Sequence, residues 1–71
     1  MRTLIKMPKV EAYWEFIIVD GAIEYAQRLP LKVPPPMVDK YRVFEWKFDD
    51  LDLLSAAKIA LELDREAAYE D

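Results

Sequence analysis

The sequence predicts an α+β fold, in which a small antiparallel sheet of three or four strands packs on one C-terminal amphipathic helix. Apolar and polar residues alternate over 10–19 and 38–48, as they do in half-buried strands. Asp20-Gly21 lies directly after the first of these stretches and is typical of a two-residue hairpin turn. Apolar side chains near the C-terminus recur instead with helical spacing, so we expect a helix over about 50–68.

The Asp20-Gly21 turn also predicts a strand register, because both residues tolerate the positive φ angles of a type I′ turn. Continued along the hairpin, a two-residue loop places Phe16 opposite Tyr25 on a mostly apolar face. It places Tyr13 opposite Arg28 on the other face, where a cation–π contact can form. A slip of one residue would exchange the two faces, so the apolar pattern favours this register.

Three stretches are less well defined by the sequence. Residues 22–29 fit either the second strand of the hairpin or a short helix. Residues 2–7 fit a short strand that ends at Pro8, but the sequence does not decide whether this strand joins the sheet. Three consecutive prolines fix φ and lack backbone donors, so 30–37 is expected to be an extended connector within a single domain, 1–71.

The helix is expected to cover the aromatic face of the sheet. Asp49 or Asp50 can cap its first turn, where the helix dipole favours carboxylates. Leu54, Ala57 and Leu61 are the expected central contacts of the helix. The face that they cover should carry eight large apolar side chains, which are Trp14, Phe16, Ile18, Ile23, Tyr25, Phe44, Trp46 and Phe48.

The composition argues against an enzyme. The chain has no cysteine and no histidine, which removes disulfides, cysteine-rich zinc sites and the commonest catalytic base. It has one glycine, so it holds no glycine-rich phosphate loop. The acidic residues Asp49, Asp50 and Asp52 lack the spacing and the glycine of a calcium loop. We therefore predict no catalytic residue, no metal site and no cofactor.

Charge and hydropathy favour a cytoplasmic protein. A net charge of −4 opposes binding to phosphate backbones and to anionic lipid. No apolar run reaches the roughly 18–20 residues that span a bilayer, and the N-terminus lacks the apolar core of a signal peptide.

The chain also lacks asparagine and is 34% charged, a composition typical of thermophile proteins.

Some apolar side chains would stay unburied in a fold of one sheet and one helix, and this predicts a protein partner. Several lie on the outer face of the strands, and the apolar arc of the helix is wider than one sheet face needs. The predicted partner-binding residues are Tyr13, Ile17, Arg28, Tyr41, Val43, Ile59, Asp64 and Ala68. We expect a non-catalytic protein-interaction module, which is a small acidic accessory subunit, an inhibitor or antitoxin-like protein, or a homodimer.

The alternative is a protein that binds single-stranded nucleic acid. Bases can stack on sheet aromatics such as Trp14 and Trp46, and basic residues such as Lys47 lie nearby. The helix is expected to cover these rings, however, and the chain is acidic. Both features favour the protein-interaction module.

Overall fold

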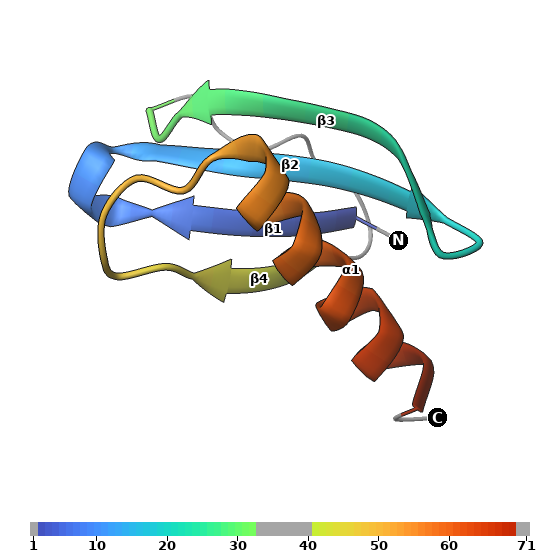
Figure 1. Cartoon of the computed structure of the whole chain (residues 1–71). Coiled ribbons are helices and arrows are strands. Elements are labelled where there is room, and N and C mark those ends of the chain that lie inside the picture. The colour runs from blue at the N-terminus through green and yellow to red at the C-terminus, as the bar shows by residue number, and fades with distance from the viewer. Residues whose placement is uncertain (1, 33–40, 70–71) are drawn as a thin grey trace.

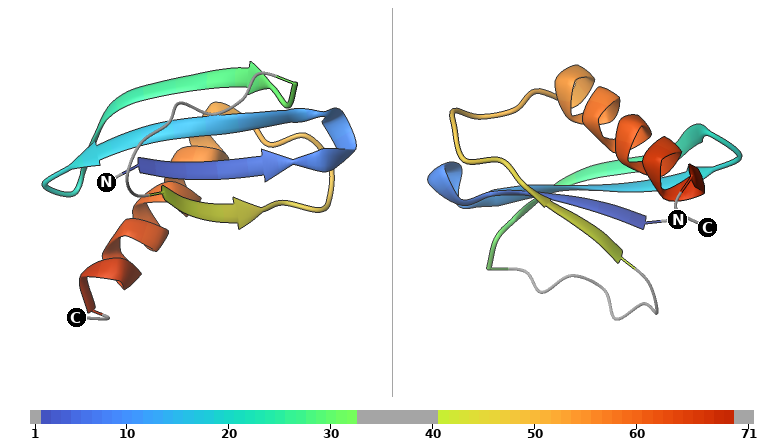
Figure 2. Two further views of the ribbon diagram at one scale, coloured as in Figure 1. Left: turned by 180° about the vertical axis from the view of Figure 1, so that it is seen from behind. Right: turned by 90° about the horizontal axis from the view of Figure 1, so that it is seen from below.

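A computed structural model describes residues 2–32 and 41–69 and shows a four-stranded sheet with one helix packed on one face (Figures 1 and 2). The predicted α+β fold is therefore confirmed, with four strands. In chain order the elements are β1 (Arg2–Met7), a 3-10 helix η1 (Pro8–Val10), β2 (Ala12–Val19), β3 (Ala22–Pro30), β4 (Tyr41–Glu45) and α1 (Leu53–Tyr69).

β1 lies in the interior of the sheet, although the sequence left its place undecided. The strand order is β3-β2-β1-β4, and β1 pairs antiparallel with β2 and parallel with β4, so the sheet is mixed rather than wholly antiparallel. Ile5 pairs with Trp14 on one side and with Phe44 on the other, and it is fully buried. The first strand of the chain therefore contributes to the centre of the core.

The turn between β2 and β3 has the predicted conformation. Asp20 and Gly21 have φ angles of 53° and 76°, both positive as a type I′ turn requires. The strand alternative is confirmed for 22–29, because β3 spans Ala22–Pro30. Pro30 ends that strand, and the rest of the expected connector, apart from 31–32, lies outside the described residues.

Gly21→Val is expected to destabilise the protein by about 1–2 kcal/mol, since a β-branched residue is strained in the left-handed region. No atom of residues 2–32 and 41–69 lies within 4 Å of a Cβ at this position, so the cost comes from the backbone and not from a clash with them. Urea denaturation measures it, with Gly21→Asn as the matched control because asparagine tolerates positive φ. Equal losses in the two variants would contradict the prediction.

A β-bulge in β3 changes the predicted register beyond the turn. Ile18 pairs with Ile23 as predicted, but the next residue of β2, Ile17, pairs with Tyr25. Glu24 is therefore an extra residue that pairs with no residue of β2. Simple alternation of apolar and polar residues cannot reveal such an insertion.

The bulge moves the rest of β3 to the opposite face from the one predicted. Tyr25 is 47% exposed on the outer face instead of lying under the helix. Arg28 pairs with Trp14, on the face that α1 covers, and not with Tyr13. The predicted Tyr13–Arg28 pair is therefore wrong.

β4 is shorter than the predicted strand over 38–48. It spans Tyr41–Glu45, while residues 38–40 lie outside the described part of the chain. Trp46 continues the pairing through one bond, since its backbone N–H donates to the Lys6 carbonyl at 2.7 Å. Phe48 lies beyond that point and is 68% exposed, so its predicted place in the core is wrong.

The core lies between α1 and the sheet. Its buried cluster is Ile5, Met7, Ala12, Phe16, Ile18, Leu51, Ala56 and Ala60. The helix approaches the strands through Ala56 and Ala60, whose short side chains are fully buried. Ala57 and Leu61 pack against this cluster as expected, but Leu54 is 69% exposed. The prediction of Leu54 as a central core contact is wrong, because Ala56 and Ala60 face the sheet in its place.

Asp52 caps α1, which begins three residues later than the predicted start. Asp52 Oδ1 accepts the backbone N–H of Ser55 at 2.7 Å, and the Asp52 carbonyl accepts the N–H of Ala56 at 2.9 Å. The hydrogen bond from the Ser55 amide is the main cause that lowers the pKa of Asp52 below its ordinary value of 3.8.

Asp52→Ala is expected to lower Tm at neutral pH and to matter less in acid. Because the folded-state pKa of Asp52 is lowered, the carboxylate stabilises the fold fully above pH 3.8, and this contribution disappears as pH falls through the folded-state value. Thermal melts of both proteins at pH 7 and in strong acid test this. The gap in Tm should narrow in acid, and an unchanged gap would contradict a role for the charge.

Candidate functional site

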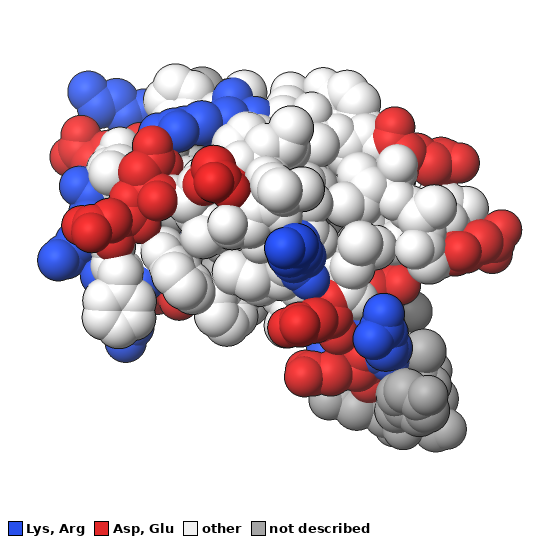
Figure 3. Space-filling model, in the orientation of Figure 1, with Lys and Arg blue, Asp and Glu red and all other residues white. Residues whose placement is uncertain are grey.

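An open apolar groove lies between β3 and the first half of α1. It has a volume of about 450 Å³ and is lined by Phe16, Ile23, Ala26, Leu53, Leu54 and Ala57. Figure 3 shows a broad uncharged area over this region, between a charged left end and acidic side chains at the right. We call this feature the β3–α1 groove.

The β3–α1 groove is hollow in the middle because two of its lining residues are small. Ala26 on β3 and Ala57 on α1 have short side chains where larger ones would close the space. Leu53 and Leu54 project at the end where the helix begins, and they are 52% and 69% exposed. Two neighbouring leucines at the rim of a hollow form an apolar surface that water solvates poorly.

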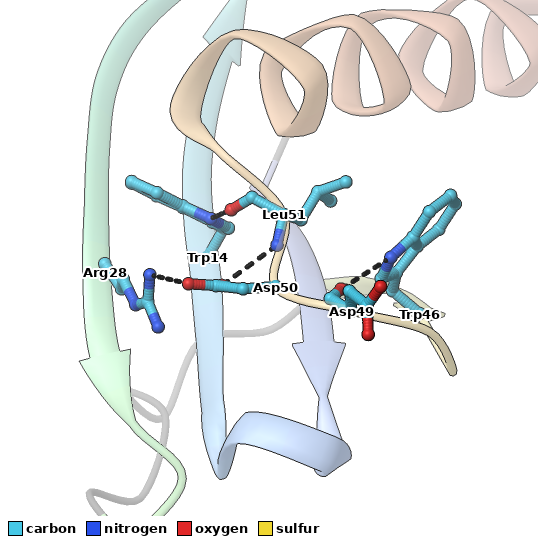
Figure 4. A network of polar contacts seen from close by, with 6 residues as sticks. All are labelled: Trp14, Arg28, Trp46, Asp49, Asp50 and Leu51. Carbon is cyan, nitrogen blue, oxygen red and sulfur yellow. Dashed lines mark hydrogen bonds and ion pairs between the residues drawn. The ribbon is translucent and has the colours of Figure 1, made fainter.

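A polar network fixes the chain that leads into the groove (Figure 4). Arg28 on β3 donates from Nη1 to Asp50 Oδ2 at 2.8 Å, and Asp50 Oδ1 accepts the N–H of Leu51 at 2.9 Å. The Trp14 indole donates to the Leu51 carbonyl at 2.8 Å. The Trp46 indole donates to the carbonyl of Asp49, the residue before Asp50, at 3.0 Å. These bonds tie the start of α1 to the sheet, so the exposed leucines are held in a defined position.

A second recess continues along the same side of α1 toward the β2–β3 turn. It has a volume of about 320 Å³ and is lined by Asp20, Gly21, Leu61, Asp64 and Arg65. Its rim carries charges of both signs, as does the other end of the groove, where Arg28 and Asp50 pair. Charged groups of both signs therefore flank an apolar centre.

The structure places only part of the predicted partner-binding set near this groove. Arg28 lies at one end of it, and Asp64 lines the second recess. Ile59 is half-buried and packs against the core cluster. Ala68 lies in the last turn of α1, and Tyr41 begins β4.

The other predicted residues lie on the face of the sheet away from α1. Val43 is 58% exposed there and Ile17 is half-buried. Tyr13 is only 1% exposed, and Leu4, which pairs with Glu15 on the same face, is 2% exposed. The expectation of an exposed apolar outer face is therefore wrong for Tyr13.

A cluster of polar side chains also lies on this outer face. Glu15 is 2% exposed and accepts a hydrogen bond from Gln27 Nε2 at 2.7 Å. Tyr25 donates from its hydroxyl to Gln27 Oε1 at 2.8 Å, and Arg2 Nη1 lies 3.6 Å from Glu15 Oε2. The bulge in β3 makes this network, because it turns Tyr25 and Gln27 to the side of Glu15.

No protein-family model, curated protein or solved structure matches this chain. What the site binds is therefore inferred from its own geometry. Within residues 2–32 and 41–69, no group of three acidic side chains is arranged to hold a metal ion. The helix of the described chain is too short and too polar to cross a bilayer.

The lining of the β3–α1 groove determines what it can do. All six lining side chains are apolar, so the groove offers no group that could donate or accept a proton. It can bind an apolar surface and exclude water from it. The sequence contained a partial signal for this, since Leu53, Leu54 and Ala57 belong to the apolar arc that was too wide for one sheet face.

Proposed function

We propose that this chain is a non-catalytic protein-interaction module that binds another polypeptide through the β3–α1 groove. The exposure of Leu53 and Leu54 at the rim of an apolar hollow carries the proposal. Burial of apolar surface yields about 25 cal/mol per Å², so covering two leucines favours association. Contiguous apolar surface of this kind is typical of a binding site.

The charges around the groove support a polypeptide rather than a small apolar ligand. Arg28 and Asp50 lie at one end, and Asp20, Asp64 and Arg65 lie at the other. Charged groups that flank an apolar centre are typical of a protein interface. A small acidic accessory subunit, an inhibitor or antitoxin-like protein and a homodimer are the classes that fit this description.

Leu54→Glu is expected to weaken binding by roughly ten- to a hundredfold, because the carboxylate would have to be desolvated in the groove. The tagged protein is purified from native lysate, and the chain that it retains in stoichiometric amount is identified and its affinity measured. Val43→Glu is the matched control, since Val43 is equally aliphatic and is 58% exposed on the opposite face.

The two variants distinguish binding through the groove from binding through the outer face of the sheet. Loss of binding in Leu54→Glu alone supports the groove. Loss in Val43→Glu alone would move the interaction to the outer face, and equal retention in both variants would contradict the proposal.

Binding of single-stranded nucleic acid is the second candidate, and one observation favours it. Phe44, Trp46 and Phe48 form a row of rings with centroids 6.3 and 5.8 Å apart, and the last ring is 68% exposed beside Lys47. Titration with a fluorescent thymidine oligomer at low salt tests it. We expect no binding, and binding that is lost in Phe48→Ala would favour this second function.

A further inference from the structure

β3 forms an edge of the sheet, and no other described strand pairs with its outer side. The Leu31 N–H donates to the Glu11 carbonyl of the neighbouring chain segment at 2.9 Å, so the backbone at Leu31 points toward β2. The direction alternates along a strand, and therefore the N–H and C=O of Ala26 and Arg28 point away from β2. In Figure 1 no described element lies beyond β3 on that side.

The charges on this strand are self-complementary about Ala26. Glu24 precedes Ala26 by two residues, and Arg28 follows it by two. If two copies of the strand pair antiparallel with Ala26 opposite Ala26, each Glu24 lies opposite an Arg28 of the other copy. An axis at Arg28 would instead bring two like charges face to face, which is unfavourable.

Both charged residues are available for such a pairing. The bulge leaves Glu24 without an opposite residue on β2, and it is exposed at the edge. Arg28 already binds Asp50 through Nη1, but a guanidinium has five donors and can hold a second carboxylate.

We propose that the groove is covered by a second copy of this chain, whose β3 pairs with the first β3 about a two-fold axis at Ala26. This inference rests on the proposed function of the groove and names its occupant. Ala26 itself lines the groove, so the axis passes beside it and the two apolar grooves lie on either side of the seam. The two sheets become one continuous sheet with both helices on the same face.

A cysteine at the axis tests the register. Directly opposed residues of a hydrogen-bonded antiparallel pair have Cα atoms about 5.5 Å apart, within the range that a disulfide spans. The chain has no cysteine of its own, so Ala26→Cys introduces a single thiol. Mild oxidation should link Ala26→Cys into a species of twice 8.4 kDa on a non-reducing gel, whereas the exposed control Val43→Cys should not. Equal linking of the two variants, or none, would overturn this register.

A charge exchange between two copies tests the pairing in solution. We expect sedimentation equilibrium to show a dimer for the natural sequence. Glu24→Arg and Arg28→Glu should each weaken it by roughly ten- to a hundredfold, because each variant places like charges together at both ends of the seam. An equimolar mixture of the two variants should dimerise again, since arginine then meets glutamate at both ends. A folding defect in either variant could not be repaired by mixing.

Two outcomes in solution would also overturn the inference. The first is a natural chain that stays monomeric at millimolar concentration, which would leave the groove as a site for a different protein and leave the Leu54→Glu capture experiment to decide the proposed function. The second is a dimer that both charge reversals leave intact.

Discussion

Phe16→Ala is expected to lower the free energy of unfolding by about 3–5 kcal/mol, the usual cost of removing a buried aromatic ring. Phe16 is fully buried on β2 beneath α1, and its ring stacks on that of Trp14 with centroids 6.0 Å apart. Small domains are stable by only about 5–15 kcal/mol, so the variant should be close to unfolded at room temperature.

Urea denaturation followed by far-ultraviolet circular dichroism measures the effect of Phe16→Ala. Val19→Ala is the control, since Val19 is an apolar residue of the same strand that is 41% exposed. It should cost less than about 1 kcal/mol. A similar loss in both variants would mean that the centre of the core lies elsewhere.

Arg2→Met is expected to cost about 1–3 kcal/mol, because it leaves a buried carboxylate with one fewer partner. Glu15 is 2% exposed, its Oε2 accepts no hydrogen bond from the described residues, and Arg2 Nη1 lies 3.6 Å from it. Arg2 is itself 29% exposed, so solvent screening reduces the loss below that of a fully buried pair.

The double variant Arg2→Met with Glu15→Leu isolates the cause. An apolar pair needs no counter-ion, so the double variant should regain most of the stability that Arg2→Met loses, as measured by urea denaturation. If the double variant is less stable than the single one, the buried charge is not the source of the loss.

The elements that the sequence predicted well are those with local signals. A type I′ hairpin turn requires positive φ at two neighbouring positions. Asp20-Gly21 is one of the few residue pairs that adopt positive φ at both positions. The spacing of apolar residues after Leu51 defined α1 because a helix repeats within a few residues. Its first residue was misplaced, since Asp49, Asp50 and Asp52 are chemically equivalent caps and only tertiary contacts assign them.

The elements that the sequence predicted poorly depend on distant residues. The interior position of β1 depends on its pairing with β4, which lies far along the chain. The pattern of residues within a short segment cannot predict such a pairing. The bulge at Glu24 adds one residue without changing the composition of β3. One inserted residue was enough to exchange the faces of Tyr25 and Arg28.

The candidate site was missed for a related reason. The apolar arc of the helix showed that side chains were in excess, but it did not show which of them the sheet would cover. Ala56 and Ala60 face the strands because they allow close approach, and Leu53 and Leu54 are left at the rim. Which residues remain exposed depends on how the helix is rotated over the sheet.

The parallel pairing of β1 with β4 has a consequence for how the chain folds. The β2–β3 hairpin closes through a two-residue turn and can form within about 1–10 μs, whereas β1 gains its second neighbour only when β4 arrives from the far end of the sequence. Such a contact closes a long loop and raises the contact order of an otherwise small domain. Docking of β4 against the first strand is therefore expected to set the folding rate, and substitutions on β4 should slow folding more than substitutions in the hairpin turn.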